Sequence, residues 1–531
     1  MEPNELIIKE LIKAKVKNLD DLARIKREVA KVHKVACPSN IDLLKTYHEL
    51  VKKKKVKKQI FIESLLKTRP VRSLSGIVNI SVLTKPYPCP GKCLYCPIEK
   101  GIPKSYVSGE PAGERAKKLN YDPYLQVKKR IEMLENEGHP TDKIELRIVG
   151  GTWSYYPKQY QNWFVKRCFE ACNQQRKITP MGVVLRYNEK AKHRIVGLSI
   201  ETRPDFINED EIKHLRELGV TMVELGVQSI YDDVLKINLR GHGIKETILA
   251  TKLLKDAGFK VLYQMMPDLP GSGLKVAETK SHLPPRAASR RSARDEKMFE
   301  ELFKNPNFQP DLLKIYPCAL LKEAPLYKWW KAGKYKPYTE KQLINLIKSI
   351  KQKIPYYVRI QRITRDIPSR SIVAGPAKIS NLRQVLAEKM KKEGWRCKCI
   401  RCREIRENYN PKEKIYLFRE NYDASGGKEI FLSFEDKNRT KLYSLLRLRI
   451  TSKNKAIIRE VHTYGPLVPI GVKKLAPQHR GLGKKLIKEA EKIAKNEFGL
   501  EKIAIISGVG VRGYFRKLNY RLKGTYMVKD L

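Results

Sequence analysis

Between about residues 77 and 360, short β-branched runs alternate with amphipathic helical segments, and this alternation restricts the possible folds more than any other feature of the sequence. Repeated strand–helix units predict a parallel sheet covered by helices, because a parallel connection must cross over the sheet. Chemistry in such folds collects in the loops that follow the carboxyl ends of the strands. The six predicted strands are 76–84, 143–151, 195–202, 222–230, 260–267 and 311–317.

The chain is long and strongly basic. Its 531 residues predict two or three domains, and its 108 Lys and Arg against 57 Asp and Glu give a formal net charge of +51. Such an excess indicates a polyanion-binding surface with nucleic acid as the leading partner; a salt-adapted or thermophilic protein is the alternative. Residues 1–76 hold 19 Lys and Arg against 9 Asp and Glu with helical apolar spacing. We interpret them as a basic helical arm that contacts RNA, with a solvated charged face as the alternative.

The N-terminal sequence contains acidic residues and lacks the apolar core of a signal peptide. No later stretch approaches the roughly 18 apolar residues of a membrane span. We therefore expect a cytoplasmic protein without membrane association. In a reducing compartment, cysteines that are close in sequence are more often metal ligands than disulfides. The chain has ten cysteines, and two groups of them are closely spaced.

The first cysteine cluster follows the first predicted strand. Cys89, Cys93 and Cys96 have the spacing C-x3-C-x2-C in a loop that also contains Pro90 and Gly91. Three thiolates can hold three irons of a [4Fe–4S] cluster and leave the fourth iron open to another ligand. A zinc site with a distant fourth ligand is the alternative.

This spacing and its placement resemble the radical S-adenosylmethionine (radical SAM) superfamily. The resemblance implies an α/β fold, namely a partial (β/α)6 TIM-like barrel. It also implies that the open iron binds the amino and carboxylate groups of S-adenosylmethionine, whose reduction releases a 5′-deoxyadenosyl radical. The candidates for contact with this cofactor lie at the ends of the next three predicted strands and are Gly150, Gly151, Glu201 and Gln228. For Glu201 and Gln228, a helix cap or a hydrogen bond in the core is the alternative role.

After about residue 410 the sequence becomes rich in antiparallel strands, and a long helix follows at 481–498. The segment from Gln478 begins with Gln-x-x-Gly-x-Gly and runs directly into this helix, and the amides of such a loop bind pyrophosphate. This α+β arrangement resembles the GNAT acetyltransferase fold, which implies acetyl-CoA as the ligand. The expected loop contacts are Gln478, Gly481, Leu482, Gly483 and Lys484.

In the GNAT family, the strand before the loop lies beside the thioester, and a tyrosine on the later helix can protonate the departing thiolate. Tyr514 fits that role, with packing against the sheet as the alternative. Many relatives have paired tyrosines here, whereas this chain has Tyr514-Phe515. Phe515 therefore lacks the second hydroxyl, and it is retained as a cofactor-binding candidate. The strand positions expected beside the thioester are Glu460, Val461, His462 and Thr463.

A radical SAM barrel followed by a GNAT domain, together with "CLYCP", "GGTWS", "IETRPDF", "ELGVQS" and "ISGVGVRGYFRKL", resembles the family of Elongator catalytic subunits. The resemblance implies that wobble uridine 34 of tRNA is the substrate. The deoxyadenosyl radical takes a hydrogen from the acetyl methyl group, and the carbon radical adds to C5 to give 5-carboxymethyluridine after hydrolysis. The resemblance also implies a catalytic lysine near acetyl-CoA, which corresponds to Lys143. The segment 274–294 is absent from the family pattern and is interpreted as a disordered insert or a sequencing artefact, with an RNA-facing loop as the alternative.

The second cysteine cluster, Cys397, Cys399 and Cys402, lies between the two predicted domains. Its short spacing in a basic segment suits a structural zinc ion, and three free thiols are the alternative. A fourth ligand could come from Cys37, Cys318 or a histidine. A basic patch is formed by Arg359, Arg362, Arg365 and Arg370, and we weigh contact with tRNA phosphates against a solvated or interdomain salt-bridge role.

The predicted organisation is a basic tRNA-binding arm at 1–76, a radical SAM domain at 77–370, a zinc-containing linker at 371–410 and a GNAT domain at 411–531. The predicted function is a tRNA carboxymethyluridine synthase that could act without other Elongator subunits, its cluster reduced by a separate electron donor. A protein lysine acetyltransferase with a structural cluster and a non-catalytic RNA-binding scaffold are the alternatives. The open-iron triad argues against both, because a structural cluster normally has four protein ligands.

Overall fold

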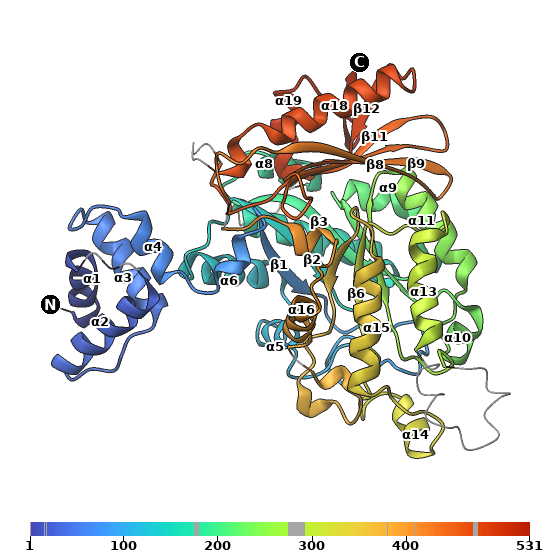
Figure 1. Ribbon diagram of the computed structural model, residues 1–531, viewed down its shortest axis with the longest axis horizontal. Coiled ribbons are helices and arrows are strands. Elements are labelled where there is room, and N and C mark those ends of the chain that lie inside the picture. Colours follow the sequence, from blue (N-terminus) through green and yellow to red (C-terminus); the bar gives the residue numbers. More distant parts are fainter. Residues whose placement is uncertain are drawn as a thin grey trace.

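The computed structural model describes residues 2–14, 16, 18–174, 180–273, 292–379, 381–407, 409–470 and 476–531. Figure 1 shows a small N-terminal helical lobe, a central α/β body and a C-terminal sheet domain that lies across one end of that body. Of the predicted insert 274–294, residues 274–291 lie outside the described residues. None of the described helices is long and apolar enough to cross a membrane.

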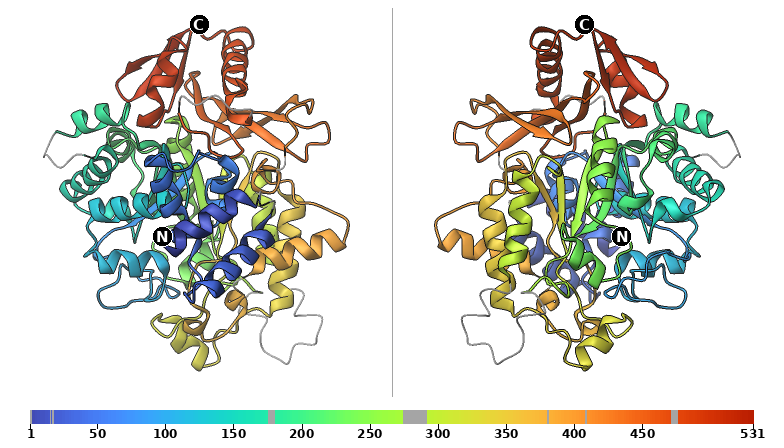
Figure 2. Two further views of the ribbon diagram at one scale, coloured as in Figure 1. Left: turned by 90° about the vertical axis from the view of Figure 1, so that its left-hand side faces the viewer. Right: turned by 90° about the vertical axis from the view of Figure 1, so that its right-hand side faces the viewer.

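The N-terminal lobe consists of helices with a small core of their own, contributed by side chains such as Ile8, Leu43 and Tyr47. Asn18 and Ser39 begin two of the helices by accepting hydrogen bonds from backbone amides three residues later. The predicted helical character of the arm is confirmed. Figure 1 shows the lobe beside the body, and Figure 2 shows it in front of the body in the left view and behind it in the right view. Its helices are α1 (Pro3–Lys13), α2 (Leu19–Val32), α3 (Asn40–Lys52) and α4 (Ile60–Leu66).

The central sheet has seven parallel strands in sequential order, which confirms the predicted partial barrel and extends it by one short strand. The two outermost strands are not paired with each other, so the barrel is open along one side. The strands are β1 (Val78–Leu83), β2 (Lys143–Val149), β3 (Arg194–Thr202), β4 (Met222–Gln228), β5 (Lys260–Met265), β6 (Leu312–Ile315) and β7 (Arg359–Arg362).

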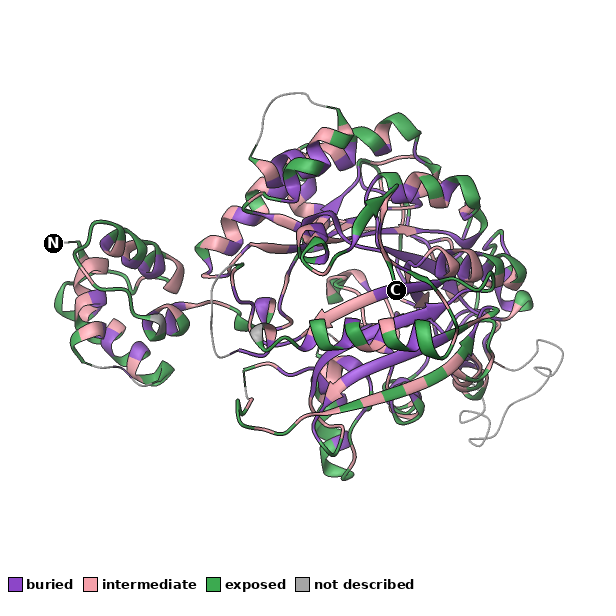
Figure 3. Ribbon diagram, turned by 90° about the horizontal axis from the view of Figure 1, so that it is seen from above, coloured by how far each residue is buried: buried purple, intermediate pink, exposed green. Residues whose placement is uncertain are grey.

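Helices cover the outside of this sheet and bury a continuous apolar core against it. Figure 3 shows the strands as mainly buried and the outer helix faces as exposed, as expected for crossover helices. The helices are α5 (Pro111–Lys118), α6 (Pro123–Asn136), α7 (Lys158–Asn173), α8 (Met181–Asn188), α9 (Glu209–Glu217), α10 (Asp232–Ile237), α11 (Ile244–Asp256), α13 (Ala293–Lys304), α14 (Leu326–Lys331) and α15 (Glu340–Lys353).

The C-terminal domain is a mixed sheet of seven strands in the order β13-β14-β12-β11-β10-β9-β8. The strands β11 and β12 are parallel and pair only between Ala456 and Ile458 on one side and Ile503 and Ile505 on the other, so the carboxyl half of β11 leaves its neighbour. Two linker helices, α16 (Leu382–Lys392) and α17 (Ile400–Arg403), precede this domain. The remaining elements are β8 (Tyr416–Ala424), β9 (Gly427–Glu435), β10 (Leu442–Ile450), β11 (Ala456–Thr463), α18 (Leu482–Asn496), β12 (Lys502–Ile505), α19 (Arg512–Arg516), β13 (Arg521–Lys523) and β14 (Tyr526–Asp530).

A buried ionic cluster fixes the C-terminal domain to the amino end of the barrel. Asp311, just before β6, accepts a hydrogen bond of 2.9 Å from Arg459 of β11, and both side chains are completely buried. Arg449 of β10 donates to Asp256 at the end of α11 at 2.6 Å. Gly508 packs directly on β3, where a Cβ atom would lie 2.1 Å from the Val196 carbonyl oxygen. The two domains therefore form one packed unit.

Candidate active site

A cavity of 570 Å³ occupies the open barrel and reaches the carboxyl ends of its strands. The three cysteines of the first triad line this cavity, together with Gly151, Glu201 and Gln228. The structure therefore brings together the cysteine loop and the carboxyl ends of three neighbouring strands, which the sequence predicted to share a site, in a volume suited to a small-molecule ligand.

The cysteine triad faces positively charged groups. Arg240 donates to the Cys93 sulfur at 3.6 Å, and the Arg203 guanidinium lies against Gly91 of the cysteine loop. Burial alone would raise the pKa of the Cys93 thiol, but the positive charge and hydrogen bond of Arg240 bring this pKa below its ordinary value. The arrangement favours the thiolate form of Cys93, whereas burial raises the pKa of Cys96 to about 12.

Gly150 and Gly151 follow the end of β2 and adopt backbone angles that favour glycine, with φ values of 121° and 67°. At Gly150 a Cβ atom would lie 2.3 Å from the Thr84 hydroxyl, which itself donates to the Gly150 carbonyl at 3.0 Å. Around Gly151 no described atom lies within 4 Å of that position. The first glycine thus allows two strand ends to meet, and the second leaves room on the cavity wall.

Glu201 at the end of β3 is held by a polar network inside the barrel. It accepts hydrogen bonds from Lys314 at 2.9 Å, from Gln264 at 3.2 Å and from Tyr106 at 3.2 Å. Burial would raise the pKa of Glu201, but Lys314 lowers it, so this carboxylate is ionised at neutral pH. It offers a fixed acceptor to a cofactor hydroxyl or ammonium group.

Gln228 ends β4 in a left-handed backbone conformation, with φ at 70°, which is uncommon for a residue with a side chain. Its side-chain oxygen is buried and has no hydrogen-bond partner among the described atoms. Strained backbone and an unsatisfied acceptor on a cavity wall are typical of a ligand-binding position.

The loop before α18 presents free amides. Gly481 precedes the helix with φ at 74°, and among the described residues no hydrogen bond uses the amides of Leu482, Gly483 and Lys484. These donors lie at the positive end of a helix of 15 residues, which suits a pyrophosphate. The Leu482 side chain is buried, whereas that of Lys484 is exposed.

Three predicted residues surround Gly483. A Cβ atom there would lie 3.5 Å from the Tyr514 hydroxyl, 3.6 Å from Val461 and 3.8 Å from the Thr463 hydroxyl. Tyr514 is partly exposed, and desolvation raises the pKa of its hydroxyl. Phe515 instead packs in the apolar core beneath the sheet. Tyr514, Val461 and Thr463 thus meet where β11 leaves β12.

The other two predicted residues of β11 point the opposite way, because alternate side chains of a strand face opposite sides. Glu460 accepts from Lys260 at 3.2 Å and from Arg447 at 2.9 Å, and His462 donates to the Ser75 carbonyl at 2.7 Å. Burial and these cations act in opposite directions, and the pKa of Glu460 falls to about 2. These two side chains face the amino end of the barrel.

Lys143 begins β2 and donates to the side-chain oxygen of Gln478 at 3.1 Å. Burial lowers the pKa of Lys143 below its ordinary value. The side-chain amide of Gln478 donates to the carbonyls of Gly76 at 3.0 Å and Thr463 at 3.2 Å. This glutamine therefore joins the arm–barrel segment, the barrel and the C-terminal domain.

The two halves of the predicted site lie at opposite ends of β2, because Lys143 begins this strand and Gly150 follows it. The rise of a β-strand places them roughly 20 Å apart. The cavity spans much of this distance, since it reaches Asn79 of β1, which is in register with Glu145, two residues from Lys143.

Comparison with known proteins is consistent with this architecture. Residues 87–279 match the Radical SAM superfamily, and residues 310–392 match the Radical_SAM C-terminal domain. The chain is 44% identical to a tRNA uridine(34) acetyltransferase of Methanocaldococcus infernus, over 99% of this chain and 98% of that protein. It is 37% identical to Elongator complex protein 3 of Homo sapiens, over 99% of this chain and 96% of that protein. The chain belongs to the tRNA uridine(34) acetyltransferase/Elongator complex protein 3 family.

A solved member of this family has the same fold. The structure of the archaeal Methanocaldococcus infernus Elp3 with an N-terminal deletion matches 86% of this chain and 100% of that chain, with a TM-score of 0.73 and 43% sequence identity. The resemblance inferred from the motifs is confirmed.

Membership of the radical SAM superfamily implies a [4Fe–4S] cluster and S-adenosylmethionine. The residues of this chain fit both groups. The Cys89 and Cys93 sulfurs lie 3.7 and 3.5 Å from the position of a Cβ atom at Gly91, so both face the space above that glycine. The room at Gly151 and the unsatisfied oxygen of Gln228 lie on the same cavity, where a cofactor ligand of the cluster would extend.

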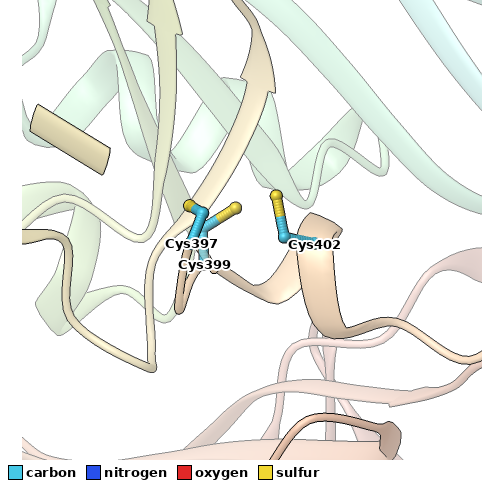
Figure 4. Close-up of side chains that lie close together, drawn as sticks. All are labelled: Cys397, Cys399 and Cys402. Carbon is cyan, nitrogen blue, oxygen red and sulfur yellow. The ribbon is translucent and has the colours of Figure 1, made fainter. Parts of the chain in front are cut away.

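The sulfur atoms of the second cysteine triad lie close together in this structure. The sulfurs of Cys397, Cys399 and Cys402 lie within 4.8 Å of one another, from α17 and the turn before it, as Figure 4 shows. They could hold a metal ion, and Lys351 donates to the Cys402 sulfur at 3.6 Å. Cys318 packs in a separate apolar cluster, and no fourth ligand joins the triad within the described part of the chain.

The predicted arginine patch is mostly paired within the protein. Arg359 of β7 contacts Glu404 at 2.7 Å, Arg365 contacts Glu110 at 2.8 Å, and Arg362 forms an ion pair with Asp366. Only the contact of Arg359 with Glu404 joins the barrel to the linker, as an interdomain salt bridge would; the pairs of Arg362 and Arg365 lie within the barrel domain.

Several residues of this site do not stand out in the sequence, although two of them carry a signal. Lys314 and Glu224 are charges inside strands that are otherwise apolar, and such residues are rarely buried unless they are paired or functional. They form a short ion pair inside the barrel. Arg203 and Arg240 lie in loops, where only the folded chain shows that they face the cysteines.

Proposed function

We propose that this chain is a tRNA carboxymethyluridine synthase that uses S-adenosylmethionine and acetyl-CoA to modify C5 of wobble uridine 34. The observation that carries the proposal is the contact of 3.1 Å between Lys143 and Gln478, because it attaches an acetyl-CoA loop to a radical SAM barrel. The names of the relatives, tRNA uridine(34) acetyltransferase, support the same substrate.

When bound, the cluster and S-adenosylmethionine would supply the radical chemistry that activates the acetyl methyl group for bonding to C5 of uridine. Cys89, Cys93 and Cys96 would hold the cluster. The cofactor would contact the strand-end residues Gly150, Gly151, Glu201 and Gln228. Closure of the cavity by the bound RNA would keep water from the radical.

The C-terminal domain would hold acetyl-CoA. The amides of Gly481 to Lys484 would bind its pyrophosphate, and the β11 residues Val461 and Thr463 would lie beside the thioester. Tyr514 would donate its phenolic proton to the departing thiolate, and its raised pKa keeps that proton on the hydroxyl at neutral pH. Lys143 would position the acetyl unit for transfer toward the barrel.

Two further assignments belong to the proposal. The N-terminal residues 1–76 would bind tRNA, supported by their excess of Lys and Arg. Zinc would occupy the triad of Cys397, Cys399 and Cys402, because thiolates at such close range suit this ion.

The test incubates anaerobically reconstituted protein with tRNA, acetyl-CoA, S-adenosylmethionine and dithionite, followed by mass spectrometry of the nucleosides. We expect 5-carboxymethyluridine only when all components are present. Absence of this nucleoside, with normal product from a related control enzyme, would overturn the proposal. Acetylation of lysine peptides that needs neither S-adenosylmethionine nor the cluster would instead support the acetyltransferase alternative.

A further inference from the structure

The open side of the barrel next to β1 is lined by arginines. This edge strand pairs only with β2, so its other edge borders the opening. The 570 Å³ cavity and a second cavity of 250 Å³ share three lining residues, Ser81, Arg115 and Arg130. The two cavities therefore adjoin at these arginines, and together they lead from the outside of the barrel to its interior.

The sequence places these side chains at the edge of β1. Gln126 of α6 covers part of the edge, because its side chain both accepts from the Leu83 amide and donates to the Leu83 carbonyl at 3.0 Å. Arg130 is one helical turn further along α6, on the same face. Arg115 comes from α5, and Arg72 from the segment that joins the N-terminal lobe to β1, next to α6 in Figure 1.

The charges in this group are not balanced. Within the described part of the chain, Arg72 alone of the three forms an ion pair with a carboxylate, that of Glu137. Among the described residues, no carboxylate lies within ion-pair distance of Arg115 or Arg130, and Arg130 donates to the sulfur of Met133 at 2.9 Å. Burial and the positive charge of Arg72 lower the pKa of Arg115, and the negative charge of Asp366 opposes this only in part. Burial and the charges of Arg115 and Arg72 lower the pKa of Arg130 to about 10. Like charges held this close are stabilised by an anion.

The geometry selects the kind of anion. Guanidinium groups bind phosphate oxygens with paired hydrogen bonds, and three of them on neighbouring elements match a backbone that carries a charge at each nucleotide. A cavity of 570 Å³ admits single nucleotides and not a duplex. RNA enzymes of this kind act on splayed, unstacked nucleotides, whose flanking phosphates then need a cationic support.

We propose that Arg72, Arg115 and Arg130 bind the phosphodiester backbone next to the target nucleotide, which enters the barrel through the opening beside β1. This inference rests on the proposed function and adds the route and the backbone contacts of the RNA. Terminal phosphates of acetyl-CoA share the same chemistry and are distinguished by the experiment.

The test measures the dissociation constant of the full-length protein and tRNA at several salt concentrations for Arg115→Gln, Arg130→Gln and the double variant. Lys128→Gln is the matched control, because it removes a charge from α6 outside the residues that line either cavity. Each arginine should contribute about 0.7 to the slope of log K against log salt. We expect the slope of the double variant to be smaller by more than one, with the slope of Lys128→Gln close to that of the wild type. Equal slopes for the double variant and the control would overturn the inference.

Two further measurements distinguish RNA phosphates from acetyl-CoA as the bound anion. Arg115→Lys and Arg130→Lys keep the charge and should retain the salt slope while losing paired hydrogen bonds, so a loss of slope in them would contradict a phosphate contact. Acetyl-CoA titrated into the same variants should bind as it does to the wild type. Weaker acetyl-CoA binding in the variants would assign the arginines to that ligand and overturn the RNA assignment.

The inference and the proposed function fail differently. If the wild type makes no carboxymethyluridine, the proposed function fails, whatever the salt slopes show. If it does make carboxymethyluridine but the double variant binds tRNA like the control, the function stands and the arginine subsite is wrong. Formation of 5′-deoxyadenosine without RNA checks that the variants keep their cofactor site.

Discussion

Lys143 at the start of β2 and Gln478 in the loop before α18 are 335 residues apart in sequence and share a hydrogen bond of 3.1 Å. Gln478 also binds the carbonyl oxygens of Gly76 and Thr463. One side chain thus links the two domains whose chemistry the proposed reaction combines. This contact is the structural reason to treat the barrel and the C-terminal domain as a single catalytic unit.

The first prediction concerns this pair. Lys143→Met should lower carboxymethyluridine formation about a hundredfold, because a positioning group would be lost near the acetyl unit. Gln478→Leu should have a similar effect, and the double variant should be no worse than the more damaging single one, since both act through one contact. Product analysis together with 5′-deoxyadenosine formation gives the measurement. Additive losses would show that the two residues act separately. Lys389→Gln, on the exposed face of α16, is the control and should leave product formation unchanged.

The second prediction concerns the cluster. Cys93→Ala should remove the bound iron and abolish 5′-deoxyadenosine formation while leaving acetyl-CoA binding intact, because the two sites lie at opposite ends of the barrel strands. Iron content and the absorbance of the reconstituted protein report the first effect, and titration calorimetry reports the second. Cys37→Ala, at an exposed cysteine of the N-terminal lobe, should change neither. Normal iron content in Cys93→Ala would contradict the assignment of the triad.

The third prediction compares two adjacent glycines. Gly150→Ala should lower the free energy of unfolding by about 3 kcal/mol or more, because it combines an unfavourable φ with a Cβ atom 2.3 Å from the Thr84 hydroxyl. Gly151→Ala has an unfavourable φ but free space, and should cost about 1–2 kcal/mol. Denaturant unfolding of both variants gives the comparison. Equal losses would mean that the contact with Thr84 relaxes without cost.

The fold was predictable where local pattern and packing agree. The β-branched runs predict the first six barrel strands, but β7, with the sequence Arg-Ile-Gln-Arg, has the pattern of a basic patch. The polar sequence of β7 does not look like a buried strand. It is compatible with one here because the barrel interior holds charged side chains such as Arg147 and Lys314 in place of apolar layers. An interior of this kind cannot be recognised from hydrophobic periodicity.

The site was predictable where a motif is contiguous in sequence. The cysteine triad and Gly151 line the cavity. Of the four predicted residues of β11, Glu460 and His462 face the barrel, whereas Val461 and Thr463 face Gly483. Strand alternation requires this division, yet which face meets the cofactor depends on how the sheet packs on the barrel. Tertiary packing also decides that Arg359 pairs with Glu404.

The fourth prediction concerns the second cysteine triad. Cys399→Ser should lose the zinc ion expected at this site, because one of its three thiolate ligands is removed. Loss of the ion should destabilise the segment between α16 and β8, since closely spaced thiolates without an ion repel one another. Metal analysis of purified protein and its melting temperature with and without a chelator give the measurement. Cys318→Ala, in a different apolar cluster, should lower the melting temperature but keep the metal. Unchanged zinc content in Cys399→Ser would contradict the assignment of a metal site to this triad.

The fifth prediction concerns His139, which ties the start of the barrel to the segment from the N-terminal lobe. Its Nε2 donates to the Thr68 carbonyl at 3.0 Å, and its Nδ1 accepts from the Ser73 hydroxyl at 2.9 Å, so the ring is neutral. Burial and the positive charges of Lys67 and Arg72 lower the pKa of His139 to about 4.

The pH dependence follows from this shift. In the unfolded chain the pKa is about 6.5, so as pH falls from 6.5 toward 4 the unfolded state gains a proton that the folded state does not. The stability that His139 contributes is therefore complete above pH 6.5 and is lost below it, by on the order of 2 kcal/mol. Denaturation midpoints between pH 7 and 4 should fall more steeply for the wild type than for His139→Gln, which cannot titrate. Parallel curves for the two proteins would show that the pKa of His139 is the same in the folded and unfolded states, which would contradict the expected shift.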